Sequence, residues 1–339
     1  MARSPAASVR LEAVAAAKRV HRQLKLKKRV ESGTGLIDVF EAIAELDIPL
    51  VFKPLTSALG LCLPAPLRGI MVTTRRGLHI QRFTAAHELG HVVLEHSGSV
   101  DREILERGPF ESQGDRDLQE VAADAFAAEF LLPRWLYKHH IRSQSWSVSG
   151  HLRKPEIIYQ LSLRMGASYE ATCWGLLNHQ ILPRREVDDL RKVSVARLKS
   201  DLGGGFKPGN SWADVWQLTD KDDGANLVGN PDDLLRIVLE EAASSGHQWQ
   251  VEALREVGYL VLSDQSTFAR DPIHYGASSV RTLIARPPKG GVATMRLREA
   301  QPWFEDGPDD STFSVNMALL GPESGGISRA SRARIGLSP

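Results

Sequence analysis

Apolar residues follow two different spacings along the chain, and the change between them predicts two parts of different fold. In the first part, apolar residues at mixed spacings and segments of helical composition predict helices at 82–94, 118–132, 156–165 and 169–179. After residue 232 they come in short runs between turn residues, as in antiparallel sheets. These runs are 234–239, 249–251, 259–262, 279–284, 293–297 and 313–317. The pattern predicts an α+β protein whose C-terminal part is an immunoglobulin-like β-sandwich.

A β-hairpin is predicted just before the first of these helices. The apolar runs Gly69–Thr74 and Leu78–Gln81 flank a turn that ends at Gly77. The edge of such a hairpin could bind an extended peptide by strand addition, although a purely structural hairpin explains the same pattern. Further along, residues 196–232 are rich in Gly, Pro, Asp and Asn, which predicts a linker with local turns.

Composition and charge narrow the class of protein. The 339 residues are 42% hydrophobic and 24% charged with a net charge of +1, so nothing attracts the whole chain to nucleic acid or membranes. No export signal or long apolar run is present, so we expect a cytoplasmic protein without membrane contact. Cys62 and Cys173 are too few for a disulfide framework. Basic residues dominate 1–30, which predicts an exposed basic helical leader, with an acidic partner as the alternative.

The segment His87-Glu88-Leu89-Gly90-His91 carries the strongest chemical signal. On a helix, residues four apart lie on one face, so His87 and His91 can direct imidazole nitrogens at one zinc ion. Glu88 lies beside them and could take a proton from the attacking water. Thr84 is a candidate cap at the start of this helix, and no Pro interrupts it. The alternative is a pair of core histidines whose hydrogen bonds are satisfied within the protein.

A catalytic zinc site usually takes three protein ligands, so a third must come from elsewhere. His96 follows His91 by five residues, which on a helix rotates it by about 140° and points it away from the metal. Glu120 and Asp124 lie one turn apart on the Ala-rich segment that ends at Pro133. Glu120 could complete the site while Asp124 accepts a hydrogen bond from a ligating histidine. In the alternative, both acids face water on an amphipathic helix.

Some nearby segments have weaker signals. Tyr137, His139, His140 and His151 are candidates for an oxyanion partner, although each is better explained as an unrelated surface or packing residue. The helices predicted at 156–165 and 169–179 flank a turn at Gly166–Ser168, which resembles a helix-turn-helix. The second of them is poor in Arg and Lys, so direct DNA binding is not expected.

The blocks RFTAAHELGHVVLEH (82–96) and EVAADAFAAEFLLP (120–133) together resemble the ImmA/IrrE family of zinc metallopeptidases. The resemblance extends upstream through 35–44 and 48–52. It implies a gluzincin-like fold, Zn²⁺ held by His87, His91 and Glu120, and Glu88 as the catalytic base. It also implies cleavage of a helix-turn-helix repressor that derepresses stress or mobile-element genes. The chain departs from the family at Asp124, where Asn is frequent, and at Leu132, where Met is common.

The C-terminal part resembles the chagasin family of peptidase inhibitors. Its three binding loops would fall at 242–247, 275–278 and 301–303. The Asn-Pro of the first loop and the Arg of the third are absent, which puts inhibition of cysteine peptidases in doubt. The alternatives are a sandwich that binds a partner or regulates its own peptidase, with Pro302 and Trp303 sealing one end.

The predicted organisation has six segments: a basic helical leader at 1–30, a zinc metallopeptidase domain at 31–150, a helix-turn-helix-like region at 151–195, a linker at 196–232, a chagasin-like sandwich at 233–322 and a flexible tail at 323–339. The function predicted is a zinc endopeptidase whose partner is a protein substrate of the repressor type. The alternatives are an inhibitory binding protein, and a DNA-binding regulator with a structural zinc site. The sequence leaves the oligomeric state open.

Overall fold

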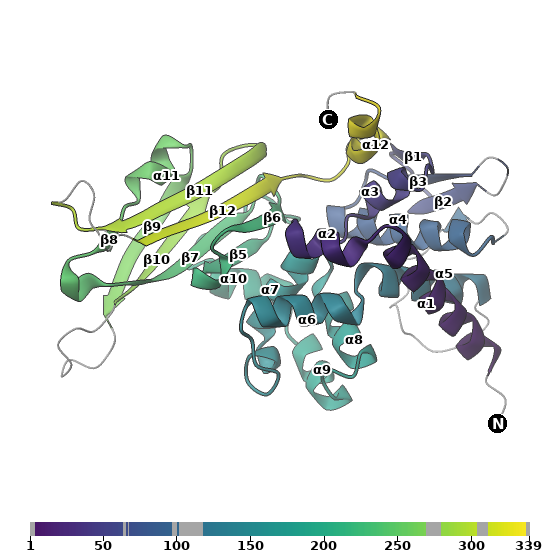
Figure 1. Cartoon of the computed structure of the whole chain (residues 1–339), viewed down its shortest axis with the longest axis horizontal. Coiled ribbons are helices and arrows are strands. Elements are labelled where there is room, and N and C mark those ends of the chain that lie inside the picture. The colour runs from purple at the N-terminus through teal and green to yellow at the C-terminus, as the bar shows by residue number, and fades with distance from the viewer. Residues whose placement is uncertain are drawn as a thin grey trace. The chain divides into compact units, whose positions relative to one another are not determined.

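The computed structural model describes residues 4–63, 66, 68–96, 100–101, 118–268, 279–303 and 311–336. The chain forms two compact units. Unit 1 comprises Met1–His139, Met165–Pro183 and Pro322–Pro339, and unit 2 comprises His140–Arg164 and Arg184–Gly321. The mixed α+β class is confirmed, with a helical N-terminal part and β-sheets in the C-terminal part (Figure 1). No helix in the described ranges has both the length and the hydropathy needed to cross a bilayer.

Helices make up most of unit 1. They are α1 (Pro5–Gln23), α2 (Leu26–Ser32), α3 (Val39–Glu45), α4 (Leu78–Val93), α5 (Leu118–Leu131), α8 (Tyr169–Asn178) and α12 (Arg329–Arg334). Helix α6 (Arg134–Ser143) begins in unit 1 and ends in unit 2.

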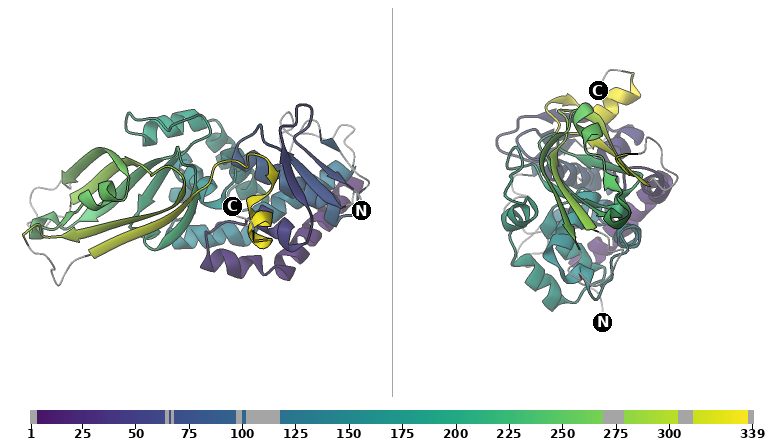
Figure 2. Two further views of the ribbon diagram at one scale, coloured as in Figure 1. Left: turned by 90° about the horizontal axis from the view of Figure 1, so that it is seen from above. Right: turned by 90° about the vertical axis from the view of Figure 1, so that its left-hand side faces the viewer.

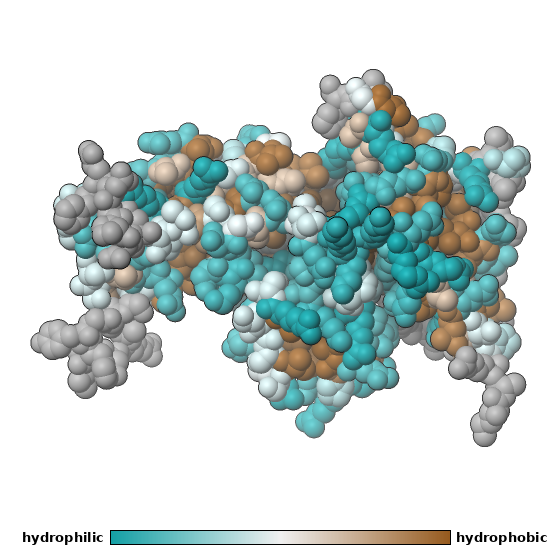
Figure 3. All heavy atoms as spheres, in the orientation of Figure 1, coloured by the Kyte–Doolittle hydropathy of each residue, from teal (hydrophilic) through white to brown (hydrophobic). Residues whose placement is uncertain are grey.

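The N-terminal segment is helical as predicted, but only its polar side is exposed. Ala13, Ala16 and Ala17 of α1 are 0% exposed, because this face packs on α5. His21, at the end of the same face, lies with Nε2 2.9 Å from the carbonyl oxygen of Phe130 in α5. Arg19 and Arg22 are exposed, Lys18 lies 3.7 Å from Glu129 of α5, and the surface over α2 is hydrophilic (Figure 3). The leader is therefore part of the core of unit 1.

A small sheet lies next to α4 in unit 1. Its strands are β1 (Leu50–Lys53), β2 (Gly60–Leu63), β3 (Gly69–Thr73), β4 (Val100–Asp101) and β13 (Gly326–Ile327), in the order β13-β1-β3-β2-β4. Strands β1 and β3 are parallel and the other pairs antiparallel.

The hairpin predicted at 69–81 is wrong. Leu78–Gln81 forms the first turn of α4, with Gly77 at its N-cap, and β3 forms its hairpin with β2 instead. Strand β3 is not an edge strand either, because it lies between β1 and β2, and the edges of the described sheet are β13 and β4. A short apolar run is compatible with either a strand or a buried helical turn. Here the run forms a helical turn, in which Gln81 is buried.

The end of the chain returns to unit 1. Strand β13 pairs with β1, where Val51 lies opposite Ile327, and Figure 2 shows this yellow segment beside the strands. The Gln81 side chain donates to the carbonyl oxygen of Glu323 at 3.0 Å and accepts from its backbone N–H at 2.8 Å. The segment predicted as a flexible tail is thus ordered from 323 to 336 by backbone pairing.

Unit 2 contains two four-stranded sheets. One has the order β5-β7-β10-β9, formed by Val215–Thr219, Leu234–Glu241, Ser279–Arg286 and Leu260–Phe268. The other has the order β6-β12-β11-β8, formed by Ala225–Gly229, Ser311–Leu319, Gly291–Ala300 and Gln248–Trp249. Buried positions alternate along β7, β11 and β12, as expected for sheets with one face in a core. The segment predicted as a linker, 196–232, contains most of α10 (Val195–Leu202) and the strands β5 and β6, so it belongs to the fold.

The helices predicted as a helix-turn-helix are present, but they do not form a separate module. Apart from its last residue, α7 (Pro155–Met165) belongs to unit 2 with α9 (Arg184–Arg191) and α11 (Glu252–Glu256), whereas α8 belongs to unit 1. Arg164 of α7 donates to both carboxylate oxygens of Asp222 at 2.8 and 2.9 Å, and both side chains are almost fully buried. This ion pair holds α7 next to the end of β5. Packing within unit 2 therefore explains the presence of this helix, and DNA binding is not needed to explain it.

Candidate metal centre

Close packing of α4 against α5 brings the two sequence motifs together. Gly90 faces Phe126, and a Cβ at Gly90 would lie only 3.1 Å from the Cβ of Phe126. Ala122, Ala123 and Ala127 keep α5 narrow, and all three are buried. Small residues at this contact allow a short distance between the helices, so side chains from α5 reach those of α4.

His87, His91 and Glu120 converge at this contact. Their ligand atoms all lie within 4.8 Å of one another. The two Nε2 atoms are 3.0 Å apart, and the Glu120 oxygens lie 3.3 Å from His87 and 3.4 Å from His91. Two imidazole nitrogens and a carboxylate are a donor set that zinc favours, and three ligands leave one position open. The structure thus brings the three predicted ligands into one group that could hold a metal, and the described residues contain no second such group.

The outer nitrogen of each histidine also has a partner. The Nδ1 of His87 lies 3.0 Å from Oδ1 of Asp124, as expected for the predicted orienting contact. The Nδ1 of His91 lies 3.0 Å from Nδ1 of His96. His96 lies outside the metal-ligand group, but its contact with His91 was missed from the sequence.

Glu88 lies where α4 meets β2. Its side chain is 0% exposed, and one carboxylate oxygen would be 2.7 Å from a Cβ placed on Gly60. The same Cβ would lie 2.5 Å from the methyl group of Thr84, so only glycine fits at this point of the strand. Thr84 does not cap α4 but packs in its interior. Packing against β2 therefore limits where the Glu88 carboxylate can lie.

The two histidines have pKa values that move in opposite directions. Burial alone would lower the pKa of His87, but the carboxylates of Asp124 and Glu120 outweigh it and raise the pKa. Burial, followed by the charge on His87, lowers the pKa of His91. Without a metal, His87 is therefore the ring that carries a positive charge and His91 stays neutral, and a cation that binds here must displace the extra proton on His87.

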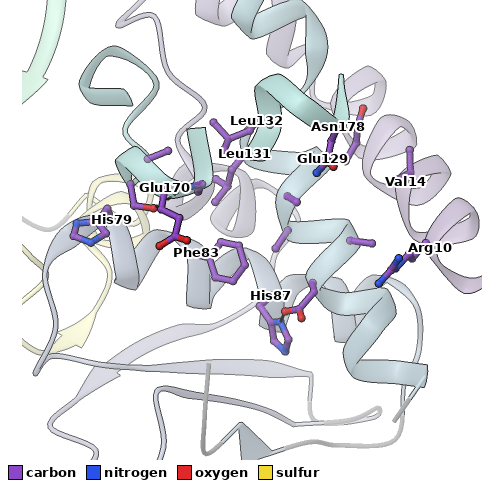
Figure 4. A pocket seen from close by; sticks show the side chains of 18 of the residues that line it. Arg10, Val14, His79, Phe83, His87, Glu129, Leu131, Leu132, Glu170 and Asn178 are labelled. Carbon is purple, nitrogen blue, oxygen red and sulfur yellow. Dashed lines mark hydrogen bonds and ion pairs between the residues drawn. The ribbon is translucent and has the colours of Figure 1, made fainter. Parts of the chain in front are cut away.

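A cavity of about 600 Å³ adjoins the metal-ligand group. His79, Phe83 and His87 are spaced four residues apart on α4 and line one wall, and Figure 4 shows Phe83 between the two histidines. Leu131 and Leu132 contribute apolar surface from the end of α5. The cavity is therefore mainly apolar, with the ligands His87 and Glu120 in its wall.

The structure gives the candidate oxyanion partners other contacts. The Tyr137 hydroxyl donates to the carbonyl oxygen of Thr172 at 3.1 Å, in a fully buried position. His151 lies with Nδ1 3.0 Å from the Ser147 hydroxyl in unit 2. His139 and His140 do not line the cavity.

In unit 2, the first and third predicted inhibitor loops lie together. Gln301 donates to the carbonyl oxygen of Ser245 at 2.7 Å, and the Trp303 ring covers Gly246, whose φ is +81°. Trp303 is nevertheless 66% exposed, so it does not seal a core. The second predicted loop, 275–278, lies outside the described residues.

Comparisons with known proteins give matches of two different kinds. Residues 43–176 match the family described as the IrrE N-terminal-like domain, a peptidase family. Amoebiasin-2 of Entamoeba histolytica is 30% identical over 97 residues, which are 28% of this chain and 76% of that protein. Two solved structures each cover 31% of this chain and are themselves covered to 96%. They are the cysteine protease inhibitor EhICP2 of Entamoeba histolytica, at 23% identity and a TM-score of 0.27, and Amebosin, at 16% and 0.23. Residues 43–176 therefore match the IrrE N-terminal-like peptidase family, and the C-terminal part of the chain resembles chagasin-type inhibitors.

Proposed function

We propose that this protein is a zinc-dependent endopeptidase, with His87, His91 and Glu120 as metal ligands and Glu88 as the general base. The observation that carries the proposal is the convergence of His87, His91 and Glu120 from two helices, with Glu88 buried on the same helix as the histidines, within the segment that matches the peptidase family. The donor set fits zinc, because both histidines have their outer nitrogens engaged and direct Nε2 toward Glu120.

Zinc, when bound, supplies a Lewis acid that polarises the scissile carbonyl and the attacking water. The chain supplies the proton transfers. Glu88 accepts a proton from that water at one carboxylate oxygen and later gives it to the amine nitrogen of the leaving peptide. Its burial against Gly60 and Thr84 keeps the carboxylate at one place throughout, which supports this role.

The cavity beside the ligands suits an apolar side chain of a protein substrate. Phe83, Leu131 and Leu132 offer such a side chain a water-poor surface next to the metal-ligand group. We propose a repressor of the helix-turn-helix type as the substrate, on the resemblance to the ImmA/IrrE family.

Co-expression with small helix-turn-helix repressors, beginning with any that is encoded next to this protein, tests the proposal. We expect a single cut in the repressor with the wild-type chain and none after treatment with a chelator. The Glu88→Gln variant should bind zinc and lose about 10²–10⁴-fold in cleavage rate. An intact repressor with the wild type, or normal turnover by the Glu88→Gln variant, would contradict the proposal.

A second candidate function is binding of a cysteine peptidase by unit 2. It is favoured by the hydrogen bond that joins the loops 242–247 and 301–303 and by the exposure of Trp303 in the second of these loops. The full-length Glu88→Gln chain, tested against papain, should inhibit it, and the Trp303→Ala variant should inhibit it less. Equal papain activity with and without the full-length chain would refute this candidate.

A further inference from the structure

His91 is held from both sides of its ring. Its Nε2 lies 3.0 Å from Nε2 of His87, and its Nδ1 lies 3.0 Å from Nδ1 of His96. The rings of His91 and His96 meet edge to face, with centroids 5.0 Å apart and planes at 74°. His96 thus contacts the nitrogen that points away from the metal-ligand group.

The end of α4 produces this contact. Glu95 adopts a left-handed conformation with φ of +57°, its N–H bonds to the carbonyl oxygen of Val92, and the N–H of His96 bonds to that of His91 at 3.0 Å. This pair of bonds is the Schellman motif, which reverses the chain directly after a helix. The reversal returns the His96 side chain to His91, although continued helical geometry would point it elsewhere.

We propose that His96 is a positioning residue for His91 and, through it, for the bound metal. His91 donates the proton on Nδ1 to Nδ1 of His96, so the lone pair on His91 Nε2 points at the metal. Asp124 does the same for His87 through the contact of 3.0 Å. Each histidine ligand then has its own acceptor, which fixes its tautomer and ring orientation.

The two acceptors differ in charge, and the difference suits the site. Glu88, Glu120 and Asp124 already bring three negative charges to the site, one more than the two positive charges of zinc balance. His96 as a neutral acceptor orients His91 without adding a fourth negative charge beside two buried rings. If a carboxylate replaced His96, no positive charge at the site would remain to balance it when zinc is bound.

The experiment measures zinc affinity by chelator competition on full-length variants, with the visible spectrum of bound Co²⁺ as a second readout. His96→Leu removes the acceptor, and we expect it to lower zinc affinity about 10- to 100-fold and to alter the Co²⁺ spectrum. His96→Asn places an oxygen near the position of Nδ1 and should restore affinity to within a few-fold of wild type. Glu95→Gly is the matched control, because glycine favours the same backbone conformation and should leave zinc affinity unchanged.

Wild-type zinc affinity in the His96→Leu variant would overturn the inference, as would an equal loss in His96→Asn. His96→Ala also lacks the acceptor and replaces His96→Leu if the larger side chain prevents folding. The inference rests on the proposed metal site, and the two fail in different ways: a wild-type chain that binds no zinc contradicts both, whereas zinc binding that is indifferent to residue 96 contradicts only the role of His96.

Discussion

The distance between α4 and α5 is set at Gly90, and the Gly90→Ala variant tests this directly. The added methyl group would lie 3.1 Å from Cβ of Phe126 and 3.2 Å from its Cγ and Cδ1, so the helices must separate by a few tenths of an ångström. Phe126 is 0% exposed and cannot swing away. Overpacking of this kind costs about 1–3 kcal/mol. Alanine in a helix is favoured over glycine by about 1 kcal/mol, which offsets only part of that cost.

We therefore expect Gly90→Ala to destabilise the protein by about 1 kcal/mol, measured by urea unfolding followed by circular dichroism. Zinc affinity should fall as well, because Glu120 moves away from the histidines of α4 by more than the tolerance of about 0.2 Å in ligand distances. The double variant Gly90→Ala with Phe126→Leu should lose less than the two single changes together. A Gly90→Ala protein that is more stable by about 1 kcal/mol and binds zinc normally would show that helix propensity alone matters there.

Three further changes follow from individual contacts. Asp124→Ala should weaken zinc binding about 10- to 100-fold in chelator competition, while Asp124→Asn keeps an acceptor for His87 and should lose far less. Burial, opposed by the bond to Phe130, lowers the pKa of His21 from 6.5. As the pH falls below about 6.5, the unfolded chain binds a proton at His21 more readily than the folded chain, so stability should fall. The melting temperature of the His21→Gln variant should therefore change less with pH than that of the wild type. Gln81→Leu leaves buried backbone groups unpaired and should cost about 2–4 kcal/mol in urea unfolding, with faster proteolysis of 323–336.

The inner part of the site follows from local sequence because its geometry is that of regular helices. His87 and His91 lie four residues apart within α4, and Glu120 and Asp124 lie four apart within α5, so helical periodicity places each pair on one face. His96 was missed because α4 ends at Val93, and beyond that residue the reversal at the helix end determines direction. A glycine at position 95 would have signalled such a helix end, but the chain has Glu95 there.

The errors in the fold have a common physical cause, which is pairing between residues far apart in the sequence. Residues 215–229 appear as linker because of their polar and turn residues, but β5 pairs with β7, and β6 pairs with β12 nearly a hundred positions later. The first helix appears exposed when its basic residues are counted, whereas Ala13, Ala16 and Ala17 form a narrow apolar face. Alanine contributes little to a hydrophobic pattern, yet it allows α1 to lie close against α5.

The peptidase unit provides the strongest case of such pairing. The chain crosses between the units after residues 139, 164, 183 and 321, so the fold of unit 1 is completed only when its last segment returns. Gln81 lies in the helix that carries His87 and His91, and it bonds to Glu323 across a sequence separation of 242 residues. The match to the peptidase family ends at residue 176, so a fragment chosen by that match would lack both β13 and the partner of Gln81. Helix α4 therefore depends on a segment that no local motif connects with it.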